Sequence, residues 1–467
     1  MPPQHVMMPK EHQNYAPMHM DTHQAQGMHP AHMPEQWLNT QQMYDRSKNY
    51  AEQKPPVNAM SQPQQPPPKR QMPTRVHPDP GFFKQPTSDA RESWNVAKEE
   101  RDTLKQLMFY DLSQRATGGS KGMIPALSKP SFCPDSKGKP YQLLVCGTEE
   151  QDPKKKDQNK LIFVQLESNF QVRSTSEGPA LWSYKIENHV RDLHWINAQR
   201  IIFAQANRLG LVRLCVDQHH NIDELVNFPE FHSDTIREIA VCPNKNNLII
   251  SGGFDGKVFV TDIDRLVSDI QKNEKKSENS LYPCRDVVGS VRWHPSETSY
   301  SSCTTDVGVL HIFDIRTDMR RPAPVVFDTN KQQLYTHDYI DGKKILLGYG
   351  DGTISIFDSR MPHKIMATFK DPHMGQIGEI KMDPNTNNFA VFGIPEFSLW
   401  STNRENLTVQ CWGHSSMNMQ ATERSETYKT SGEFLKTKNG IIGVTDSAGK
   451  LAIFERQSKE QQENEKP

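Results

Sequence analysis

Long apolar runs are missing from this chain of 467 residues. A membrane-spanning helix needs about 20 consecutive, mostly apolar residues, and no run here approaches that length. The Met-rich amino terminus also lacks the apolar block of a secretory signal. These absences predict an intracellular protein, nuclear or cytoplasmic or both, that does not insert into a membrane.

The usual sequence signatures of catalytic and metal sites are missing too. There is no Gly-rich phosphate loop, no nucleophile elbow and no helical His pair beside a glutamate. The seven cysteines form no pair at metal-ligand spacing, so they are expected to be reduced and mostly buried. We therefore predict no enzymatic activity, no catalytic residue, no metal site and no cofactor.

A strong excess of charge of either sign is also lacking. The formal net charge is −1, from 55 Lys and Arg against 56 Asp and Glu. This balance gives no electrostatic reason to expect avid binding to nucleic acid or to membranes, although it is compatible with a local charged patch. Nucleic acid is therefore expected as a partner only indirectly.

Residues 1–84 contain almost no Val, Ile or Leu and are dominated by Gln, Pro, Met and His. Such a segment cannot build an apolar core, so it is predicted to be disordered. Its irregularly spaced histidines are interpreted as solvated, and so is "HH" at 219–220. The string "PPPKR" at 66–70 leaves open a polyproline ligand or part of a nuclear-import patch, but a plain solvated linker is favoured. The charged residues 459–467 are also expected to be disordered.

Residues 85–119 are predicted to form a short amphipathic helix and a linker. From Asp89 to Gln114 the segment begins with Asp-x-x-Glu and places apolar residues at approximate helical spacing: Trp94, Leu104, Leu107 and Met108. "TGG" at 117–119 then ends the helix. Its apolar stripe is expected to dock on the folded domain of the same chain or on a partner.

Beyond residue 120 one unit recurs. "LIISGGFDGKVFVTDI" is followed by "SYSSCTTDVGVLHIFDIR" and "KILLGYGDGTISIFDSR", each a strand, a turn and a second strand. Five marker positions lie 52, 44, 43 and 54 residues apart: Thr261, Phe313, Phe357, Trp400 and Phe454. Each copy has an upstream strand, and two degenerate copies precede them, giving seven. A period near 40 to 45 residues is typical of propeller blades.

The repeat resembles the WD-repeat β-propeller family over roughly residues 120–458. In "HSDTIREIAVCPNKNNLIISGGFDGKVFVTDI", His232, Ser251 and Asp255 occupy the positions of that family's buried hydrogen-bond network. Thr261 replaces the usual Trp, which only Trp400 keeps. Four-stranded units cannot bury both faces alone, so they must stack into a closed ring. We predict an all-β, seven-bladed, WD-repeat-like β-propeller, preceded by the tail and the helix. Ring closure in this family implies that residues before blade one, within 120–130, supply the outer strand of blade seven.

Two further strings stand out in the repeats. "FDIR" and "FDSR" place Arg316 and Arg360 after Asp314 and Asp358, similar to the motif with which some WD-repeat receptors contact the adaptor of cullin-type ubiquitin ligases. The same string also stabilises blades, and a role in bracing neighbouring blades through buried carboxylates is favoured over partner binding. "SDIQKNEKKSENS" at 268–280 is interpreted as a solvated loop between blades three and four.

These features together predict a noncatalytic protein–protein interaction scaffold or adaptor subunit of an intracellular multiprotein complex. Its partners would be other proteins of that complex, with a ubiquitin-ligase adaptor as one candidate. Two alternatives stay open: a substrate receptor of a cullin-type ubiquitin ligase, and a chromatin- or ribonucleoprotein-associated scaffold.

Overall fold

The computed structural model describes the chain between residues 104 and 456 and leaves out the residues outside these limits. Within them it also omits 113–125, 135–140, 151–153, 155–157, 177, 216–220, 273–279, 285, 318–324, 330–331, 362–364, 372–373, 395, 403–408 and 416–428. The predictions made for residues 1–84, for "HH" at 219–220 and for 459–467 therefore lie outside the described residues.

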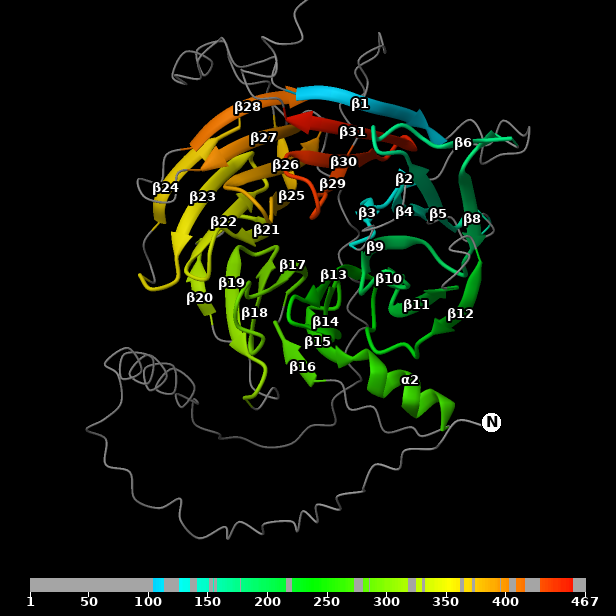
Figure 1. The fold of residues 1–467 in the computed structure, drawn as a ribbon. Coiled ribbons are helices and arrows are strands. Elements are labelled where there is room, and N and C mark those ends of the chain that lie inside the picture. Colours follow the sequence, from blue (N-terminus) through cyan, green and yellow to red (C-terminus); the bar gives the residue numbers. More distant parts are fainter. Residues whose placement is uncertain are drawn as a thin grey trace, which may run out of the picture. The chain divides into compact units, whose positions relative to one another are not determined.

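Seven antiparallel sheets follow one another around a ring, which confirms the predicted seven-bladed β-propeller (Figure 1). Blade 1 contains β2 (Ala126–Leu127), β3 (Ser131–Phe132), β4 (Gln142–Glu149), β5 (Lys160–Leu166) and β8 (Leu181–Lys185). Blade 2 contains β9 (Val190–Trp195), β10 (Arg200–Gln205), β11 (Arg208–Leu214) and β12 (Ile222–Asn227). Blade 3 contains β13 (Ile236–Cys242), β14 (Lys245–Gly253), β15 (Lys257–Asp262) and β16 (Ser280–Pro283).

The remaining blades repeat this order. Blade 4 contains β17 (Val288–Trp293), β18 (Tyr300–Thr305), β19 (Val309–Asp314) and β20 (Val325–Asp328). Blade 5 contains β21 (Leu334–Tyr339), β22 (Lys344–Tyr349), β23 (Thr353–Asp358) and β24 (Ile365–Lys370). Blade 6 contains β25 (Gln376–Met382), β26 (Asn388–Ile394), β27 (Phe397–Thr402) and β28 (Val409–Ser415). Blade 7 contains β29 (Thr430–Phe434), β30 (Ile441–Asp446), β31 (Lys450–Arg456) and β1 (Leu104–Asp111). A small hairpin, β6 (Ser174–Thr175) with β7 (Gly178–Pro179), stands apart.

Strand β1 corrects the sequence prediction in two ways. Leu104–Asp111 was expected in an amphipathic helix, but it is the outer strand of blade 7 and pairs antiparallel with β31. The outer strand was expected from residues 120–130, whereas β2 in that region belongs to blade 1. Met108 of β1 and Leu112, which directly follows β1, are buried in the core that blades 7 and 1 share. This burial favours the strand over the helix that the spacing predicts. Residues 89–103 and 113–114 of the expected helix lie outside the described residues.

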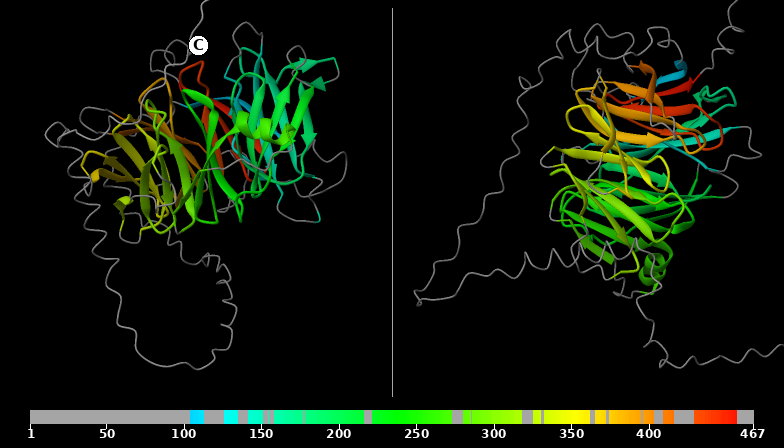
Figure 2. Two further views of the ribbon diagram at one scale, coloured as in Figure 1. Left: turned by 90° about the horizontal axis from the view of Figure 1, so that it is seen from below. Right: turned by 90° about the vertical axis from the view of Figure 1, so that its left-hand side faces the viewer.

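Apolar side chains of successive blades interdigitate to form the core. The second and third strands of each blade are almost entirely buried, and their Val, Ile, Leu and Phe residues pack against the neighbouring sheets. In both views of Figure 2 the strands are gathered into twisted sheets. Gly256 and Gly352, in the predicted hairpin turns, have φ values of +69° and +83°, which few other residues adopt.

The charged insertion after β15 lies inside blade 3, not between blades 3 and 4 as expected. Its first part is helix α2 (Ile263–Gln271), and the chain then returns to β16 of the same blade. Asp262 caps the helix by accepting hydrogen bonds from the backbone N–H groups of Asp264 and Arg265. Ile263 and Leu266 are buried, so one face of the helix packs on the propeller.

Candidate functional site

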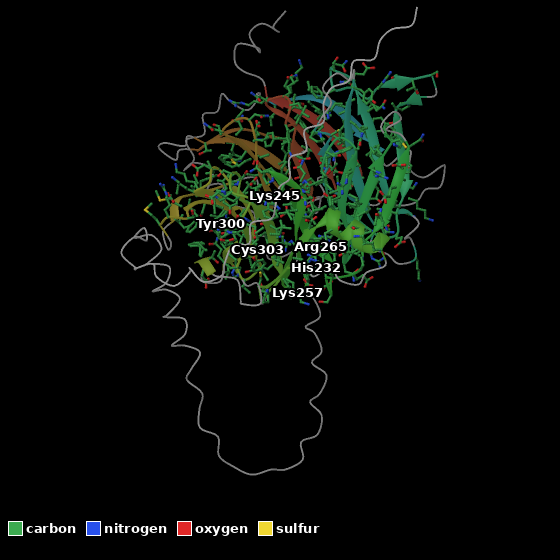
Figure 3. All side chains as sticks on the ribbon, turned by 60° about the horizontal axis from the view of Figure 1, so that its bottom comes forward. His232, Lys245, Lys257, Arg265, Tyr300 and Cys303 are labelled. Carbon is green, nitrogen blue, oxygen red and sulfur yellow. The ribbon has the colours of Figure 1, made fainter. Side chains whose placement is uncertain are left out.

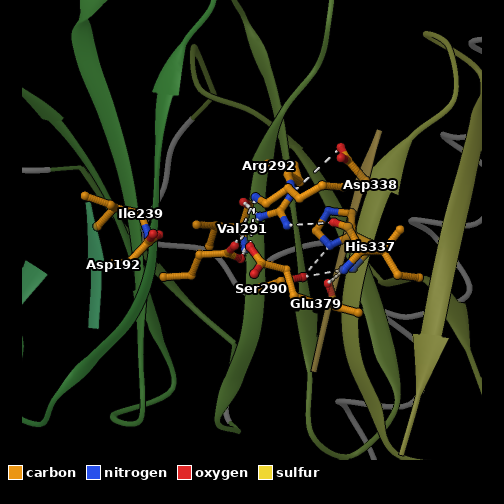
Figure 4. A network of polar contacts seen from close by, with 12 residues as sticks. Asp192, Ile239, Ser290, Val291, Arg292, His337, Asp338 and Glu379 are labelled. Atoms are coloured by element: carbon orange, nitrogen blue, oxygen red, sulfur yellow. Dashed lines mark hydrogen bonds and ion pairs between the residues drawn. The ribbon is translucent and has the colours of Figure 1, made fainter. Parts of the chain in front are cut away.

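The inner strands form a closed circle around the axis of the propeller. β3, β9, β13, β17, β21, β25 and β29 each contact the inner strand of the next blade, and β29 returns to β3. Side chains fasten neighbouring inner strands by accepting backbone hydrogen bonds: Asp192 from Ile239 (2.9 Å), Glu238 from Val291 (3.0 Å), Ser290 from His337 (3.2 Å) and Asp338 from Met382 (2.8 Å) (Figure 4). These repeated contacts indicate that the inner strands run side by side in one direction.

A network of buried charges crosses the centre of this circle. We call it the inner ion network, and it comprises Lys129, Asp192, Glu238, Arg292, Asp338, Glu379 and Lys381. Its ion pairs form an unbroken chain: Asp192–Lys129 (2.6 Å), Lys129–Glu379 (3.5 Å), Glu379–Lys381 (3.3 Å), Lys381–Glu238 (3.5 Å), Glu238–Arg292 (2.6 Å) and Arg292–Asp338 (3.7 Å). Ser431 of blade 7 donates a hydrogen bond to Glu379 (2.5 Å). The network therefore connects all seven blades.

Electrostatics favour the ionised forms of three members of this network: Asp192, Glu238 and Lys129. Burial by itself would raise the pKa of Asp192, but the ammonium of Lys129 and then His194 lower it below the ordinary range. Burial opposes ionisation of Glu238 as well, yet Arg292 and Lys381 lower its pKa to about 2. The carboxylates of Asp192 and Glu379 raise the pKa of Lys129 although burial alone would lower it. Carboxyls with such lowered pKa values are not poised to exchange protons near neutral pH, which argues for a structural role.

A second set of side chains lies near the start of the inner strands, where β-bulges recur. The register shifts after the first residue of β13, β17 and β21 and after the second residue of β25, and β9 has a shift at the corresponding place. Bulges re-aim the inserted residue, and three of the five insertions carry large side chains: Arg191, Arg237 and Tyr335.

These bulge residues contact one another through turns of neighbouring blades. Arg191 pairs with Glu149 of blade 1 at 2.6 Å, and its guanidinium lies 5.5 Å from the ring centre of Phe254. Arg237 pairs with Asp306 of blade 4 at 2.7 Å. Its guanidinium lies 5.8 Å from the ring of Phe254 and 5.4 Å from that of Tyr335. We call these six residues the bulge ladder; they extend from blade 1 to blade 5 near the start of the inner strands.

The predicted network residues of blade 3 are hydrogen-bonded to one another. His232, labelled in Figure 3, belongs to this group. Its Nδ1 lies 3.0 Å from Asp255 and its Nε2 lies 3.0 Å from Ser251. This order of contacts matches that of a Ser–His–Asp catalytic triad. Ser251 and His232 are buried, however, so a substrate has no access to the hydroxyl. Thr261, at the place of the usual Trp, has a buried Oγ1 without a hydrogen-bond partner among the described residues.

Comparable networks in other blades use different residues. In blade 6 the indole of Trp400 donates to Ser398 (2.7 Å), which donates to Asp371 (2.5 Å). In blade 4 the histidine comes from the next blade, because His337 of β21 lies 2.6 Å from Ser290 and 2.7 Å from Ser302. Burial and then the charge of Arg292 lower the pKa of His337 well below its usual value. Sequence reasoning missed His337, because this residue lies in the repeat of blade 5 whereas its partners lie in blade 4.

Arg316 and Arg360 lie on the surface. Their side chains are 64% and 55% exposed, and each pairs at 2.5 Å with the aspartate two residues earlier, Asp314 or Asp358. These arginines lower the pKa of both carboxyls. The pairs lie within one blade each, so they differ from the expected brace between neighbouring blades through buried carboxylates. Asp358 itself is buried, whereas Asp314 keeps some solvent contact.

A cavity of about 410 Å³ lies among the turns at the other end of the inner strands, between Pro134, Trp195, Pro243 and Lys436. Among the residues that the structure describes, no group of three or more His, Cys, Asp or Glu is placed to hold a metal ion. No helix in this described part is long and apolar enough to cross a membrane.

The inner ion network and the bulge ladder were not recognised from sequence. A signal was present, because the upstream strands "VGSVRWHPS" and "IGEIKMDPN" alternate charged and apolar residues. Alternation alone predicts a strand with one face in solvent. Only closure of the ring directs the charged face of each inner strand toward the axis, where the charges meet.

Comparison with known proteins gives one distant similarity. No family model matches the chain. Over 134 residues the chain is 22% identical to histone acetyltransferase type B subunit 2 of Candida glabrata. The matched stretch covers 29% of this chain and 30% of that protein, less than a third of either. The seven-bladed ring and this similarity together support a WD-repeat propeller family.

Proposed function

We propose that this chain is a noncatalytic interaction scaffold or adaptor subunit of an intracellular multiprotein complex. The observation that carries the proposal is the contrast between two sets of polar residues on the inner strands. The inner ion network is buried and internally paired, whereas the bulge ladder presents charged and aromatic groups on strands that the network holds rigid. Rigid presentation lowers the ordering cost of binding a partner. The name of the distant relative also describes a subunit of a larger assembly.

Affinity purification of the full-length protein, followed by mass spectrometry and size-exclusion chromatography, tests this proposal. We expect a reproducible set of stoichiometric protein partners and an apparent mass well above that of the 53.4 kDa chain. Purification of the chain alone under gentle conditions, as a monomer, would refute it.

A second candidate function is that of a substrate receptor of a cullin-type ubiquitin ligase. The exposure of Arg316 and Arg360 favours this candidate, because a guanidinium on the surface is available to a carboxylate or carbonyl of a partner. We expect the Arg316→Ala, Arg360→Ala double variant to lose the ligase adaptor while it keeps other partners. Co-purification of the adaptor at the wild-type level would exclude these arginines as its contact.

A chromatin-associated scaffold is the third candidate, and the name of the distant relative is its only support. Co-purified histones that resist nuclease treatment would favour it. Absence of both histones and RNA from the purified complex would exclude this candidate and its ribonucleoprotein variant.

A further inference from the structure

One cation at the start of β29 has no acidic partner among the residues that the structure describes. Lys429 directly precedes this strand, and only its backbone is hydrogen-bonded, to Ser447. Its ammonium has no ion pair or hydrogen bond to any of the residues described. Its Cε lies 3.4 Å from the place where a Cβ on Gly378 would stand. Gly378 occupies the bulge position of blade 6, so the missing side chain leaves room for the lysine.

Lys429 belongs to the same electrostatic environment as the bulge ladder. The protein atoms around its ammonium displace part of the surrounding water and so lower its pKa, and the positive charge of Arg191, and to a smaller extent of Arg237, lowers it further. Glu149 and Glu379 act in the opposite direction without cancelling the shift. The three cations therefore repel one another, and a bound anion would relieve that repulsion.

The charge count at this place favours an anionic ligand. Arg191 and Arg237 each have an acidic ion-pair partner, Glu149 and Asp306, whereas Lys429 has no ion pair with any described residue and stays available to a carboxylate. Three other carboxylates of nearby turns already accept backbone hydrogen bonds: Asp255 from Lys257, Asp286 from Val307 and Asp351 from Thr353. Those aspartates stabilise turns and are not paired with the three cations.

Both arginines keep donors for a ligand while their orientation is fixed. Each uses Nη1 for its acidic partner, and the remaining guanidinium N–H groups have no other partner in the described part of the chain. Phe254 packs against both guanidinium groups and Tyr335 against one of them, which restricts their rotation. A planar guanidinium held in this way is suited to a carboxylate. The same aromatic faces are already covered by arginine, so they are poorly placed to receive a second cation.

We infer that the bulge ladder and Lys429 bind an acidic peptide segment of a protein partner, with one carboxylate on Lys429 and another on the free N–H groups of Arg191 or Arg237. This inference rests on the proposed scaffold function and specifies the chemistry of one partner. The ligand is a carboxylate-rich protein segment, not a basic peptide and not a nucleic acid.

Fluorescence anisotropy of a labelled decaglutamate peptide with the full-length protein tests the inference. We expect Lys429→Glu to weaken binding at least about tenfold, which is about 1.4 kcal/mol. The matched control is Lys245→Glu, an exposed lysine at the start of β14 that pairs with Cys242 at the opposite end of β13, and it should leave the affinity within about twofold. Both lysines are exposed, so both variants should melt like the wild type. Binding should also weaken as salt is raised.

Several outcomes would overturn the inference. They are an absence of decaglutamate binding by the wild type, an equal loss of decaglutamate affinity in Lys429→Glu and Lys245→Glu, and tighter binding of decalysine or oligothymidine than of decaglutamate. Affinity purification separates this failure from failure of the scaffold function. If the wild-type protein retains partners that Lys429→Glu also retains, only the acidic-peptide inference fails. If the wild type retains none, the scaffold proposal fails whatever the peptide result.

Discussion

Substitution of Lys129 by Met is expected to destabilise the propeller severely. The lysine side chain is 3% exposed and lies between the carboxylates of Asp192 (2.6 Å) and Glu379 (3.5 Å), so it joins blade 1 to blades 2 and 6. Its removal leaves two buried carboxylates without their shared cation. Breaking a buried pair in this way costs about 3–5 kcal/mol. Methionine keeps most of the side-chain volume, so the loss reports the charge and not a cavity.

The same substitution predicts a specific pH dependence. In the wild type the pKa values of Asp192 and Glu379 are lowered by Lys129, so this contribution is present above the unfolded pKa of about 4 and is lost as the pH falls through the folded values. Without Lys129, burial raises both pKa values relative to the wild type. Protonation of these two carboxyls then removes the unpaired buried charge of the variant at a higher pH than that at which they are protonated in the wild type. The difference in free energy of unfolding between the wild type and Lys129→Met should be largest near pH 7 and should become smaller toward pH 4.

Urea unfolding followed by tryptophan fluorescence at pH 7 and pH 5 measures both effects. The matched control is Lys438→Met, which removes an exposed ion pair with Glu455 and should cost less than about 1 kcal/mol at either pH. Addition of Asp192→Asn to Lys129→Met should recover part of the loss. A Lys129→Met protein within about 1 kcal/mol of the wild type, or a loss that does not change with pH, would refute the reasoning.

Three further predictions follow from burial and exposure. Deletion of residues 1–84 should leave the melting temperature unchanged. Deletion of residues 1–112 should lower it, because this removes β1 with the buried Met108 and Leu112, each worth about 1.5–3 kcal/mol, and exposes the edge of β31. Equal melting temperatures of the two proteins would contradict this role of β1. Six of the seven cysteines are buried, and only Cys215 is partly exposed, so a thiol reagent should modify at most one cysteine in the native protein and all seven in denaturant; rapid native reaction of several would contradict the described burial. The Arg316→Ala, Arg360→Ala double variant should melt close to the wild type, because solvent screens both exposed pairs; a large drop in melting temperature would support the bracing hypothesis.

The repeat pattern by itself determined the architecture. Seven copies of a strand–turn–strand unit were visible because each blade pairs strands that are neighbours in sequence, so local spacing records them. The positive-φ turns at Gly256 and Gly352 were predictable for the same reason, since a tight hairpin imposes its backbone requirement on a short string. The hydrogen-bonded group of His232, Ser251 and Asp255 also lies within one repeat and was located from its sequence.

Contacts between distant repeats were decided only by the tertiary structure. Leu104–Asp111 has a spacing compatible with a helix, yet it forms a strand because its partner β31 stands more than 300 residues later. Lys129 and Glu379 come together only when blade 1 and blade 6 face the same central axis. The bulge ladder likewise needs residues of blades 1, 2, 3, 4 and 5. Closure of the ring sets these distances, and no local pattern in the sequence encodes them.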